Sequence, residues 1–504
     1  MTNHLFDNLL GLRAGEAKTF IDVPSGEQIG FDDMYALTGQ VASALVAMGV
    51  QPGDRVAVQV EKSAQAVALY LGVVRAGAIF LPLNTAYTPS EIDYFIGNAE
   101  PEVFVCDPGK RDAFAGIADN HAARLETLGA DGRGSLWEAV EQAPAEFDTV
   151  ARGRDDLGAI LYTSGTTGRS KGAMLSHENL LSNARVLKDY WRFSDEDVLL
   201  HALPIYHSHG LFVAINTCLL AGATMIFFQK FDVDAVLREM PRATSMMGVP
   251  TFYTRLLASD AFTKDVAGHM RLFISGSAPL LAETHKQFSD RTGHAILERY
   301  GMTETNMNTS NPYSGDRRAG TVGFPLPGVE LRVADPETGE VLGTDEIGVI
   351  EVKGPNVFSG YWRMPEKTAE EFREDGFFIT GDLGKVDADG YVTIVGRGKD
   401  LVISGGFNVY PKEIEEKIDD LDGVAESAVI GVPHPDFGEG VTAVVVKDGR
   451  KDLSEDDIAA AIKEDLATFK RPKRIFFVDE LPRNTMGKVQ KNVLRETYKD
   501  IYEG

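Results

Sequence analysis

The run YTSGTTGRSKG at residues 162–172 has the residue types of an anion-binding loop. Glycine lets backbone N–H groups approach an anion closely, and hydroxyls and a lysine add further donors. The run follows an apolar, strand-like segment at 159–161. These residues predict a cradle for a polyphosphate. Its side-chain donors are Thr163, Ser164, Thr166, Thr167, Ser170 and Lys171, and its glycines are Gly165, Gly168 and Gly172.

The spacing separates this run from the Walker loop of P-loop NTPases. The Walker pattern needs a glycine, four residues and then Gly-Lys-Ser/Thr. Here Gly165 and Gly168 are too close together, and Lys171 is followed by Gly172. A P-loop NTPase is therefore disfavoured, and a flexible connector rich in Ser, Thr and Gly is the alternative interpretation.

The run resembles, nearly residue for residue, the phosphate-binding signature of the adenylate-forming acyl-CoA synthetase superfamily. Ser170 is a departure, because the superfamily usually has proline there, but serine removes no donor. The resemblance covers the chain from about residue 30 onward, because the motifs below follow in the same order. It implies that the ATP phosphates are bound by Thr163, Ser164, Gly165, Thr166, Thr167, Gly168 and Lys171, with Thr163 also acting in catalysis.

Two later segments have the residue types of an adenine site. In FISGSAPL at 273–280, small residues at the end of a strand leave room for a flat ring. In ILERYGMTET at 296–305, Tyr300 offers a stacking surface, and Glu304 offers the oxygen ligand that suits Mg²⁺. The resemblance assigns Glu304 to Mg²⁺ and catalysis. It assigns to ATP binding Gly276, Ser277, Ala278, Pro279, Glu298, Tyr300, Gly301, Met302 and Thr303.

A carboxylate on a tight turn, Asp382 in TGD at 380–382, is suited to accept hydrogen bonds from both ribose hydroxyls. Arg397, in GRGKD at 396–400, can reach the same ribose. The resemblance assigns both residues to ATP and makes Lys399 the hinge between two domains. It therefore implies a large domain at 1–397 and a small mobile domain at 398–504.

Lys488, in PRNTMGK at 482–488, has no nearby partner in the sequence, so a solvated lysine is the ordinary interpretation. The resemblance instead implies that Lys488 is the adenylation lysine. Rotation about Lys399 would then withdraw it and bring up Gly405 and Gly406 to form the coenzyme A channel. Because acetylation removes the lysine charge, Lys488 is also a candidate substrate for a protein lysine acetyltransferase and deacetylase.

Three histidines lie close together in HALPIYHSHG at 201–210. A metal site is disfavoured, because no cysteine or carboxylate accompanies them and Pro204 breaks helical spacing. In the resembling superfamily, His207 occupies the position of an aromatic residue that gates the carboxylate pocket. We expect His201 and His209 to pack in the interior.

Arg299 stands where aryl- and fatty-acyl-activating members of the superfamily have a small residue, often glycine. A large cation shortens the pocket, and a buried unpaired guanidinium is costly. The second carboxylate of a small dicarboxylic acid would pair with it, with Arg255 as a second donor. An internal salt bridge with Glu298 or another acid is the alternative. The motifs ERYG and GRSKG resemble those of malonyl-CoA synthetases, which favours malonate as the acid, with methylmalonate tolerated.

The reaction implied by the resemblance has two steps. A carboxylate attacks ATP to give an acyl-AMP and pyrophosphate, and coenzyme A then displaces AMP, with Mg²⁺ as the cofactor. The alternatives are an oxalate or succinate ligase, loading of a carrier-protein thiol, or a nucleotide-binding sensor without turnover. An amino-acid adenylation module is less favoured, because no aspartate is placed to hold an α-amine near His207.

The composition sets the class of protein. A chain of 504 residues predicts two or three compact units, and a net charge of −25 argues against nucleic-acid or anionic-membrane partners. Cys106 and Cys218 lie in apolar runs, which predicts buried thiols. The first residues lack a signal-peptide pattern, and the longest apolar stretch, at 218–228, is too short to span a bilayer. We therefore expect a cytoplasmic protein.

The elements that must position these residues follow a βαβ rhythm. Strand-like runs at 56–60, 79–83 and 103–106 alternate with a helix that Ser63 caps and Gly77 ends, which predicts a parallel sheet covered by helices. The expected class is α/β, and the resemblance adds a distorted barrel to the large domain. For the small α+β domain we predict strands at 401–403, 427–432 and 441–446 and helices at 411–418 and 454–466.

Overall fold

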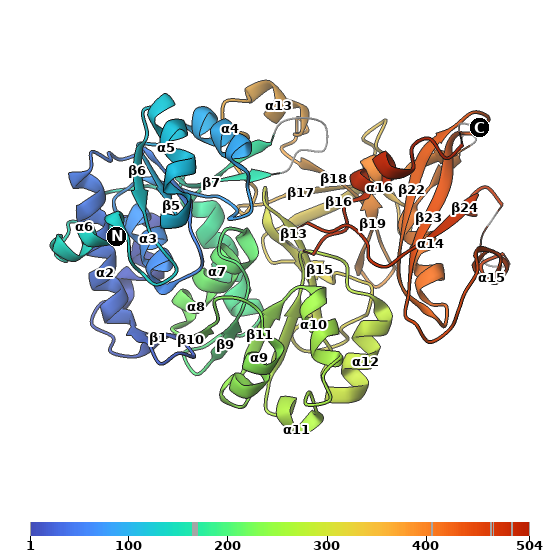
Figure 1. The fold of residues 1–504 in the computed structure, drawn as a ribbon, viewed down its shortest axis with the longest axis horizontal. Helices are drawn as coiled ribbons and strands as arrows, with labels where there is room; N and C mark the ends of the chain where they lie inside the picture. The colour runs from blue at the N-terminus through green and yellow to red at the C-terminus, as the bar shows by residue number, and fades with distance from the viewer. Residues whose placement is uncertain are drawn as a thin grey trace.

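A computed structural model describes residues 2–163, 170–404, 407–463, 466, 468–484 and 487–502. It shows a large N-terminal part with two helix-covered sheets and a four-stranded sheet, followed by a small α+β unit, orange to red in Figure 1. The predicted α/β class, with a large and a small domain, is confirmed. Cys106 and Cys218 are free and buried, as predicted. No helix within the described ranges is long and apolar enough to cross a membrane.

The first sheet has the order β6-β5-β3-β4-β7-β8 and is parallel except for the β7–β8 pair. The predicted strands are confirmed to within about a residue, and Ser63 Oγ caps the following helix by accepting from Ala66 N–H at 3.1 Å. The strands are β3 (Arg55–Gln59), β4 (Ile79–Pro82), β5 (Val103–Cys106), β6 (Arg124–Thr127), β7 (Leu157–Thr163) and β8 (Lys171–Ser176). The helices in this part are α2 (Phe31–Ala47), α3 (Ala64–Arg75), α4 (Pro89–Ala99), α5 (Arg111–Asn120) and α6 (Ser135–Gln142).

The second sheet has the order β15-β14-β13-β12-β11-β9-β10-β1-β2. Its strands are β1 (Thr19–Asp22), β2 (Gln28–Gly30), β9 (Val198–His201), β10 (Thr224–Phe227), β11 (Ser245–Gly248), β12 (Leu272–Ser275), β13 (Leu297–Met302), β14 (Asn306–Ser310) and β15 (Phe324–Pro325). The central strands are parallel, so the loops after β9, β11 and β12 leave from one edge. Ligands of such sheets bind at that edge. The helices are α7 (His177–Tyr190), α8 (Asn216–Ala221), α9 (Val233–Glu239), α10 (Pro250–Leu257), α11 (Lys264–Ala267) and α12 (Ala282–Thr292), with a π-helix at His209–Ile215.

A four-stranded antiparallel sheet stands where the resemblance implied a distorted barrel. Its strands are β16 (Glu330–Ala334), β17 (Gly348–Lys353), β18 (Phe378–Val386) and β19 (Val392–Arg397), and α13 (Pro365–Glu370) precedes β18. Asp382 on β18 and Arg397 on β19 are register partners. The sheet therefore places the two predicted ribose residues side by side.

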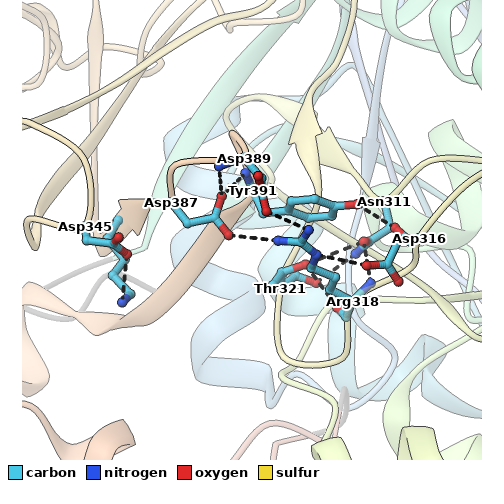
Figure 2. A network of polar contacts seen from close by, with 9 residues as sticks. Asn311, Asp316, Arg318, Thr321, Asp345, Asp387, Asp389 and Tyr391 are labelled. Carbon is cyan, nitrogen blue, oxygen red and sulfur yellow. Dashed lines mark hydrogen bonds and ion pairs between the residues drawn. The ribbon is translucent and has the colours of Figure 1, made fainter.

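A network around Arg318 joins this sheet to the second sheet (Figure 2). Arg318 forms ion pairs with Asp316 at 3.0 Å and with Asp387 and Asp389, in the turn after β18, at 3.2 and 2.8 Å. Its backbone N–H donates to Asn311 Oδ1 at 3.2 Å, and Asn311 N–H donates to Glu298 O on β13 at 2.9 Å. The network therefore fixes the adenine segment relative to the ribose segment.

The small domain has a sheet of order β21-β20-β23-β22, with β24 on β23, and its own apolar core. The predicted strands and the first helix are confirmed, whereas β24 and the last helix were not predicted. The predicted helix at 454–466 is too long, because the described helix ends at Ala461 and Ile462 and Lys463 lie in a turn. The elements are β20 (Val402–Ser404), β21 (Phe407–Val409), β22 (Val424–His434), β23 (Gly438–Lys447), β24 (Arg474–Val478), α14 (Pro411–Asp419), α15 (Glu455–Ala461) and α16 (Lys491–Tyr498).

The first helix, α1 (His4–Leu9), is tied to α7 through His177. His177 is buried, and its Nδ1 accepts from Leu5 N–H at 3.2 Å. Burial lowers the pKa of His177 to about 4. The folded state therefore keeps this ring neutral at pH values where an unfolded chain, with a histidine pKa near 6.5, takes up a proton.

We therefore expect His177 to make the fold less stable at mildly acidic pH. A base whose pKa is lower in the folded state makes the fold less stable as the pH falls below its unfolded-state pKa. For His177 the free energy of unfolding should fall by about 1.4 kcal/mol between pH 8 and pH 5.5. Urea unfolding of wild type and His177→Asn, whose amide oxygen can replace Nδ1, measures the effect. The difference in the free energy of unfolding between wild type and the variant should shrink by that amount as the pH is lowered. A difference that does not change with pH would contradict the prediction.

Candidate active site

The predicted adenine segments meet at the carboxyl edge of the second sheet. β12 ends at Ser275, which is the register partner of Glu298 on β13, so the loop from Gly276 starts beside Glu298. Ser277 has a left-handed backbone, with φ of 73°, which is uncommon for a residue other than glycine. The structure therefore brings together the residues of two motifs that are separated by about twenty positions in the chain.

Tyr300, Asp382 and Arg397 form a hydrogen-bonded group. Tyr300 OH donates to Asp382 Oδ2 at 2.6 Å, and Arg397 Nε lies 2.7 Å from Asp382 Oδ1. Burial, reinforced by the Asp382 charge, holds the pKa of Tyr300 well above its usual value, so its hydroxyl stays a donor. Each carboxylate oxygen keeps a lone pair for a ribose hydroxyl. The geometry therefore fits the predicted ribose site.

Lys171 and Glu304 belong to one polar chain. Lys171 Nζ pairs with Glu371 Oε1 at 2.7 Å, and Tyr361 OH lies 2.7 Å from Glu371 Oε2 and 3.1 Å from Glu304 Oε1. Glu304 is 5% exposed, and burial raises its pKa. Our sequence reasoning missed Tyr361 and Glu371. The sequence GYWRMPEKTAEEF carries them in a segment with no pattern that points to phosphate chemistry.

Lys488 lies at the contact between the two domains. Its backbone N–H donates to Asn484 Oδ1 at 2.9 Å, and a methyl group built on the neighbouring Gly487 would lie 3.4 Å from Thr251 of α10. Burial and then the Arg397 charge lower the pKa of Lys488, while Asp382 opposes the shift. The predicted adenylation lysine therefore shares the electrostatic environment of the ribose residues.

Arg299 is 4% exposed, and two of its three guanidinium nitrogens are buried. Among the described residues, none hydrogen-bonds to Nε or Nη2. Glu298 lies on the opposite face of the strand and accepts from Gly320 N–H at 3.3 Å, so the predicted alternative of an Arg299–Glu298 salt bridge is wrong. Burial lowers the pKa of Arg299 to about 9, which leaves it charged at neutral pH.

The guanidinium of Arg299 packs directly against Gly276. A methyl group built on Gly276 would lie 2.3 Å from Arg299 Cζ. Such a separation is far below van der Waals contact, so no side chain fits at residue 276 while Arg299 holds this position. The glycine predicted for the adenine site therefore also makes room for the cation of the acid site.

Two histidines complete the surroundings of Arg299. His209 is buried, its Nδ1 lies 3.2 Å from Ser277 Oγ, and burial and then the Arg299 charge hold its pKa well below the usual value. His207 is half-buried, and burial lowers its pKa to about 4. The Nε2 atoms of both rings are buried without a partner in the described part of the chain. The role of His207 at the carboxylate pocket stays a prediction, whereas His209 has a more polar role than packing.

The loop that carries these histidines is closed at its base by His201. His201 Nε2 donates to the Gly210 carbonyl at 2.8 Å, so Nδ1 is unprotonated and accepts from Lys62 Nζ at 2.7 Å. Lys62 also donates to His201 O at 2.8 Å and lies 4.1 Å from the Phe227 ring centroid. Sequence reasoning gave Lys62 no role, because it lies 139 residues from His201.

Arg255 is exposed, and its guanidinium lies 5.1 Å from the Phe231 ring centroid. The structure does not assemble it with Arg299, so its role as a second carboxylate donor stays a prediction. Met302 and Thr303 are half-buried at the end of β13, as their predicted position requires. The predicted residues that lie outside the described ranges are Ser164, Gly165, Thr166, Thr167, Gly168, Gly405 and Gly406.

Glu304 provides the donor chemistry for Mg²⁺ when phosphate oxygens complete the coordination. In the ranges that the structure covers, no group of three or more His, Cys, Asp or Glu side chains could hold a metal ion. A single buried carboxylate is what Mg²⁺ commonly takes from protein when substrate phosphates supply other ligands. The residues present therefore fit an ion that arrives with a nucleotide.

Comparison with protein families finds two matches in this chain. Residues 12–362 match the model of the AMP-binding enzyme family, and residues 413–488 match the model of the AMP-binding enzyme C-terminal domain. A curated relative, malonate–CoA ligase of Arabidopsis thaliana, is 35% identical over 492 residues, which covers 91% of this chain and 80% of the relative.

Solved structures distinguish two arrangements of similar chains. The ATP-bound structure of MatB from Rhodopseudomonas palustris is 65% identical, and each chain is covered completely with a TM-score of 0.98. The apo structure of MatB from the same organism has the same identity and coverage but a TM-score of 0.87. Because identity and coverage are equal, the difference lies in the arrangement of the chain, which is nearer to that of the ATP-bound structure.

Proposed function

The chain belongs to the AMP-binding enzyme family of adenylate-forming acyl-CoA ligases, and from this membership we propose that it converts malonate to malonyl-CoA. The enzyme is an AMP-forming acid–thiol ligase that uses ATP and coenzyme A. The malonate–CoA ligase and MatB relatives support malonate as the acid. We include methylmalonate as a second acid, because a methyl branch leaves both carboxylates unchanged.

The observation that carries this proposal is the unpartnered donor group around Arg299. Two guanidinium nitrogens and the Nε2 atoms of His207 and His209 are buried without hydrogen-bond partners in the part of the chain described. An unpaired buried charge costs several kcal/mol, so the site is complete only when an anion binds. The carboxylate of malonate that does not react supplies that anion, whereas a monocarboxylic acid leaves the donors unsatisfied.

The adenylation step joins two anions, so its barrier is dominated by charge. One carboxylate oxygen of malonate attacks the α-phosphorus of ATP, the bond to the β-phosphate oxygen breaks, and pyrophosphate leaves. Lys171 and Lys488 offset the charge of the phosphates and of the attacking oxygen. Glu304 would hold Mg²⁺, which screens the phosphate charge when it is bound. Tyr300, Asp382 and Arg397 hold the adenosine.

The second step transfers the malonyl group to the coenzyme A thiol, which forms the thioester and releases AMP. We propose that the domain at 398–504 turns about Lys399 between the steps, with Gly405 and Gly406 lining the thiol channel. Burial lowers the pKa of Lys399 to about 8. The Asp400 charge acts against this shift, and the Arg397 charge adds to it. The position of Lys399 in a short turn between β19 and β20 supports a hinge there.

The first test is ATP-dependent AMP formation with coenzyme A across acetate, oxalate, malonate, methylmalonate and succinate. We expect malonate to exceed acetate by on the order of 10³-fold or more in kcat/KM, because acetate leaves the buried donors unpaired. Oxalate and succinate should be poorer, because the spacing of their carboxylates differs from that of malonate.

Each contrary outcome identifies an alternative. Preference for succinate or oxalate would keep the ligase and replace the acid, and acyl transfer only to a carrier protein would replace the thiol. ATP binding without pyrophosphate release for any acid would favour a sensor. A control without coenzyme A separates adenylation from thioester formation.

We include two cellular properties in the proposal. Lys488 is an exposed loop residue, although desolvation of its ammonium lowers its pKa, and this exposure supports acetylation by a protein acetyltransferase, with reversal by a deacetylase. Mass spectrometry that finds the acetylated protein fully active would contradict it. The acidic composition and the two free, buried cysteines support a cytoplasmic location.

A further inference from the structure

Tyr361 and Glu371 connect two residues of the nucleotide site that come from different elements. Lys171 begins β8, Glu304 follows β13, and neither touches the other directly in the hydrogen-bond pattern. Glu371, just after α13, pairs with Lys171 at 2.7 Å, and Tyr361 OH lies 2.7 Å from Glu371 and 3.1 Å from Glu304. A continuous polar path therefore runs from the phosphate lysine to the Mg²⁺ carboxylate.

The Tyr361 hydroxyl is shared by two carboxylates but has one proton. Its shorter contact is to Glu371 Oε2 and its longer contact is to Glu304 Oε1, so two acceptors compete for the one hydroxyl proton. Because the contact to Glu371 is the shorter one, Glu304 holds this proton less closely and keeps oxygen lone pairs for a cation. The path therefore ends at the carboxylate that fits Mg²⁺.

The path is rigid. Tyr361 is 2% exposed and Glu304 5%, and the Lys171 ammonium lies 4.1 Å from the Tyr361 ring centroid. Glu371 accepts from a second cation, Lys367, at 3.3 Å. Lys171 uses one of its three N–H donors on Glu371 and keeps two for phosphate oxygens. Glu371 thus orients the ammonium without consuming its capacity to bind phosphate.

We propose that Glu371 and Tyr361 are positioning residues that set the separation between the Lys171 ammonium and the Glu304 carboxylate, so that Mg²⁺ and the β- and γ-phosphates bind as one unit. The inference rests on the proposed ATP-dependent adenylation. It predicts that affinity for triphosphate and for Mg²⁺ depends on both residues, whereas affinity for AMP does not.

Titration calorimetry of the full-length protein, with a non-hydrolysable ATP analogue and with AMP, tests this inference. Glu371→Gln should weaken binding of the analogue with Mg²⁺ by about tenfold, because a charge-assisted hydrogen bond that aims Lys171 is lost. Tyr361→Phe keeps the ring beneath Lys171 and should raise the Mg²⁺ concentration for half-maximal binding by about fivefold. AMP affinity should change by less than about twofold in both variants, and the double variant should lose less than the product of the single losses.

Glu370→Gln is the matched control, because Glu370 is the preceding residue, is exposed and pairs only with Lys367 in the described contacts. It should bind both nucleotides as wild type does. Unchanged or tighter binding of the analogue by Glu371→Gln would overturn the inference, because Glu371 would then be a competing counter-ion. An equal loss of AMP affinity would also overturn it, because the residue would then be structural. Failure of wild type to bind the analogue would instead refute the proposed function.

Discussion

Lys488→Ala is expected to stop adenylation while the enzyme still binds ATP. Loss of a cation beside the attacking carboxylate should lower the rate of pyrophosphate release by on the order of 10³-fold, about 4 kcal/mol in the barrier. ATP affinity should change little, because the groups that fit the nucleotide, Tyr300, Asp382 and Arg397, lie in the large domain. Pyrophosphate release and calorimetric ATP binding measure the two effects separately.

The second half-reaction provides an internal check on this variant. If Lys488 acts only in adenylation, Lys488→Ala supplied with malonyl-AMP should transfer the malonyl group to coenzyme A at nearly the wild-type rate. Lys451→Ala is a suitable control, because Lys451 is an exposed lysine of the same domain. Parallel losses of ATP affinity and adenylation, or a slow second half-reaction, would show that Lys488 supports the domain contact instead.

Arg299→Met is expected to lose malonate as a substrate without losing stability. The variant removes the cation that pairs with the second carboxylate, so kcat/KM for malonate should fall by on the order of 10³ to 10⁴-fold. Acetate and propionate should gain relative to malonate, because no buried charge remains unpaired. Steady-state AMP formation with each acid gives the ratio.

The thermal stability of the same variant separates a substrate receptor from a structural residue. Replacement of an unpaired buried charge by an apolar side chain of similar length is neutral or stabilising. We therefore expect an unchanged or higher Tm without malonate, and a smaller rise in Tm on adding malonate than in wild type. A lower Tm with unchanged malonate activity would contradict the role of Arg299. Arg299→Gly, which also opens the pocket, should behave similarly with malonate and accept longer acids.

Local patterns accounted for much of the fold. The strands at 56–60, 79–83 and 103–106 are short apolar runs, and Ser63 is a helix cap, so each follows from neighbouring residues. The helix predicted at 454–466 was too long, because an apolar periodicity continues past the point where the backbone turns at Ile462. The order of the strands in the two large sheets depends on contacts between distant segments, which no local pattern encodes.

Part of the chemistry of the site could also be predicted from the sequence. Motifs with close spacing, such as 296–305 and 380–382, predicted residues for the nucleotide, because their functional groups lie within a few positions of one another. Lys62, Tyr361 and Glu371 were missed, because each acts through a partner far away in the chain: Lys62 on His201, and Tyr361 and Glu371 on Glu304 and Lys171.

The sequence by itself predicted the kind of chemistry, through residue types and a family resemblance: a phosphate cradle, a carboxylate for Mg²⁺, a ribose carboxylate and a cation at residue 299. Side-chain type fixes donor, acceptor and charge, so these properties need no coordinates. Only the tertiary structure decided that two guanidinium nitrogens of Arg299 have no partner among the described residues. The opposite faces of β13 send Glu298 toward Gly320 and Arg299 toward Gly276 and the histidines. The function of a buried charge depends on the groups around it, and only folding brings those groups together from distant parts of the chain.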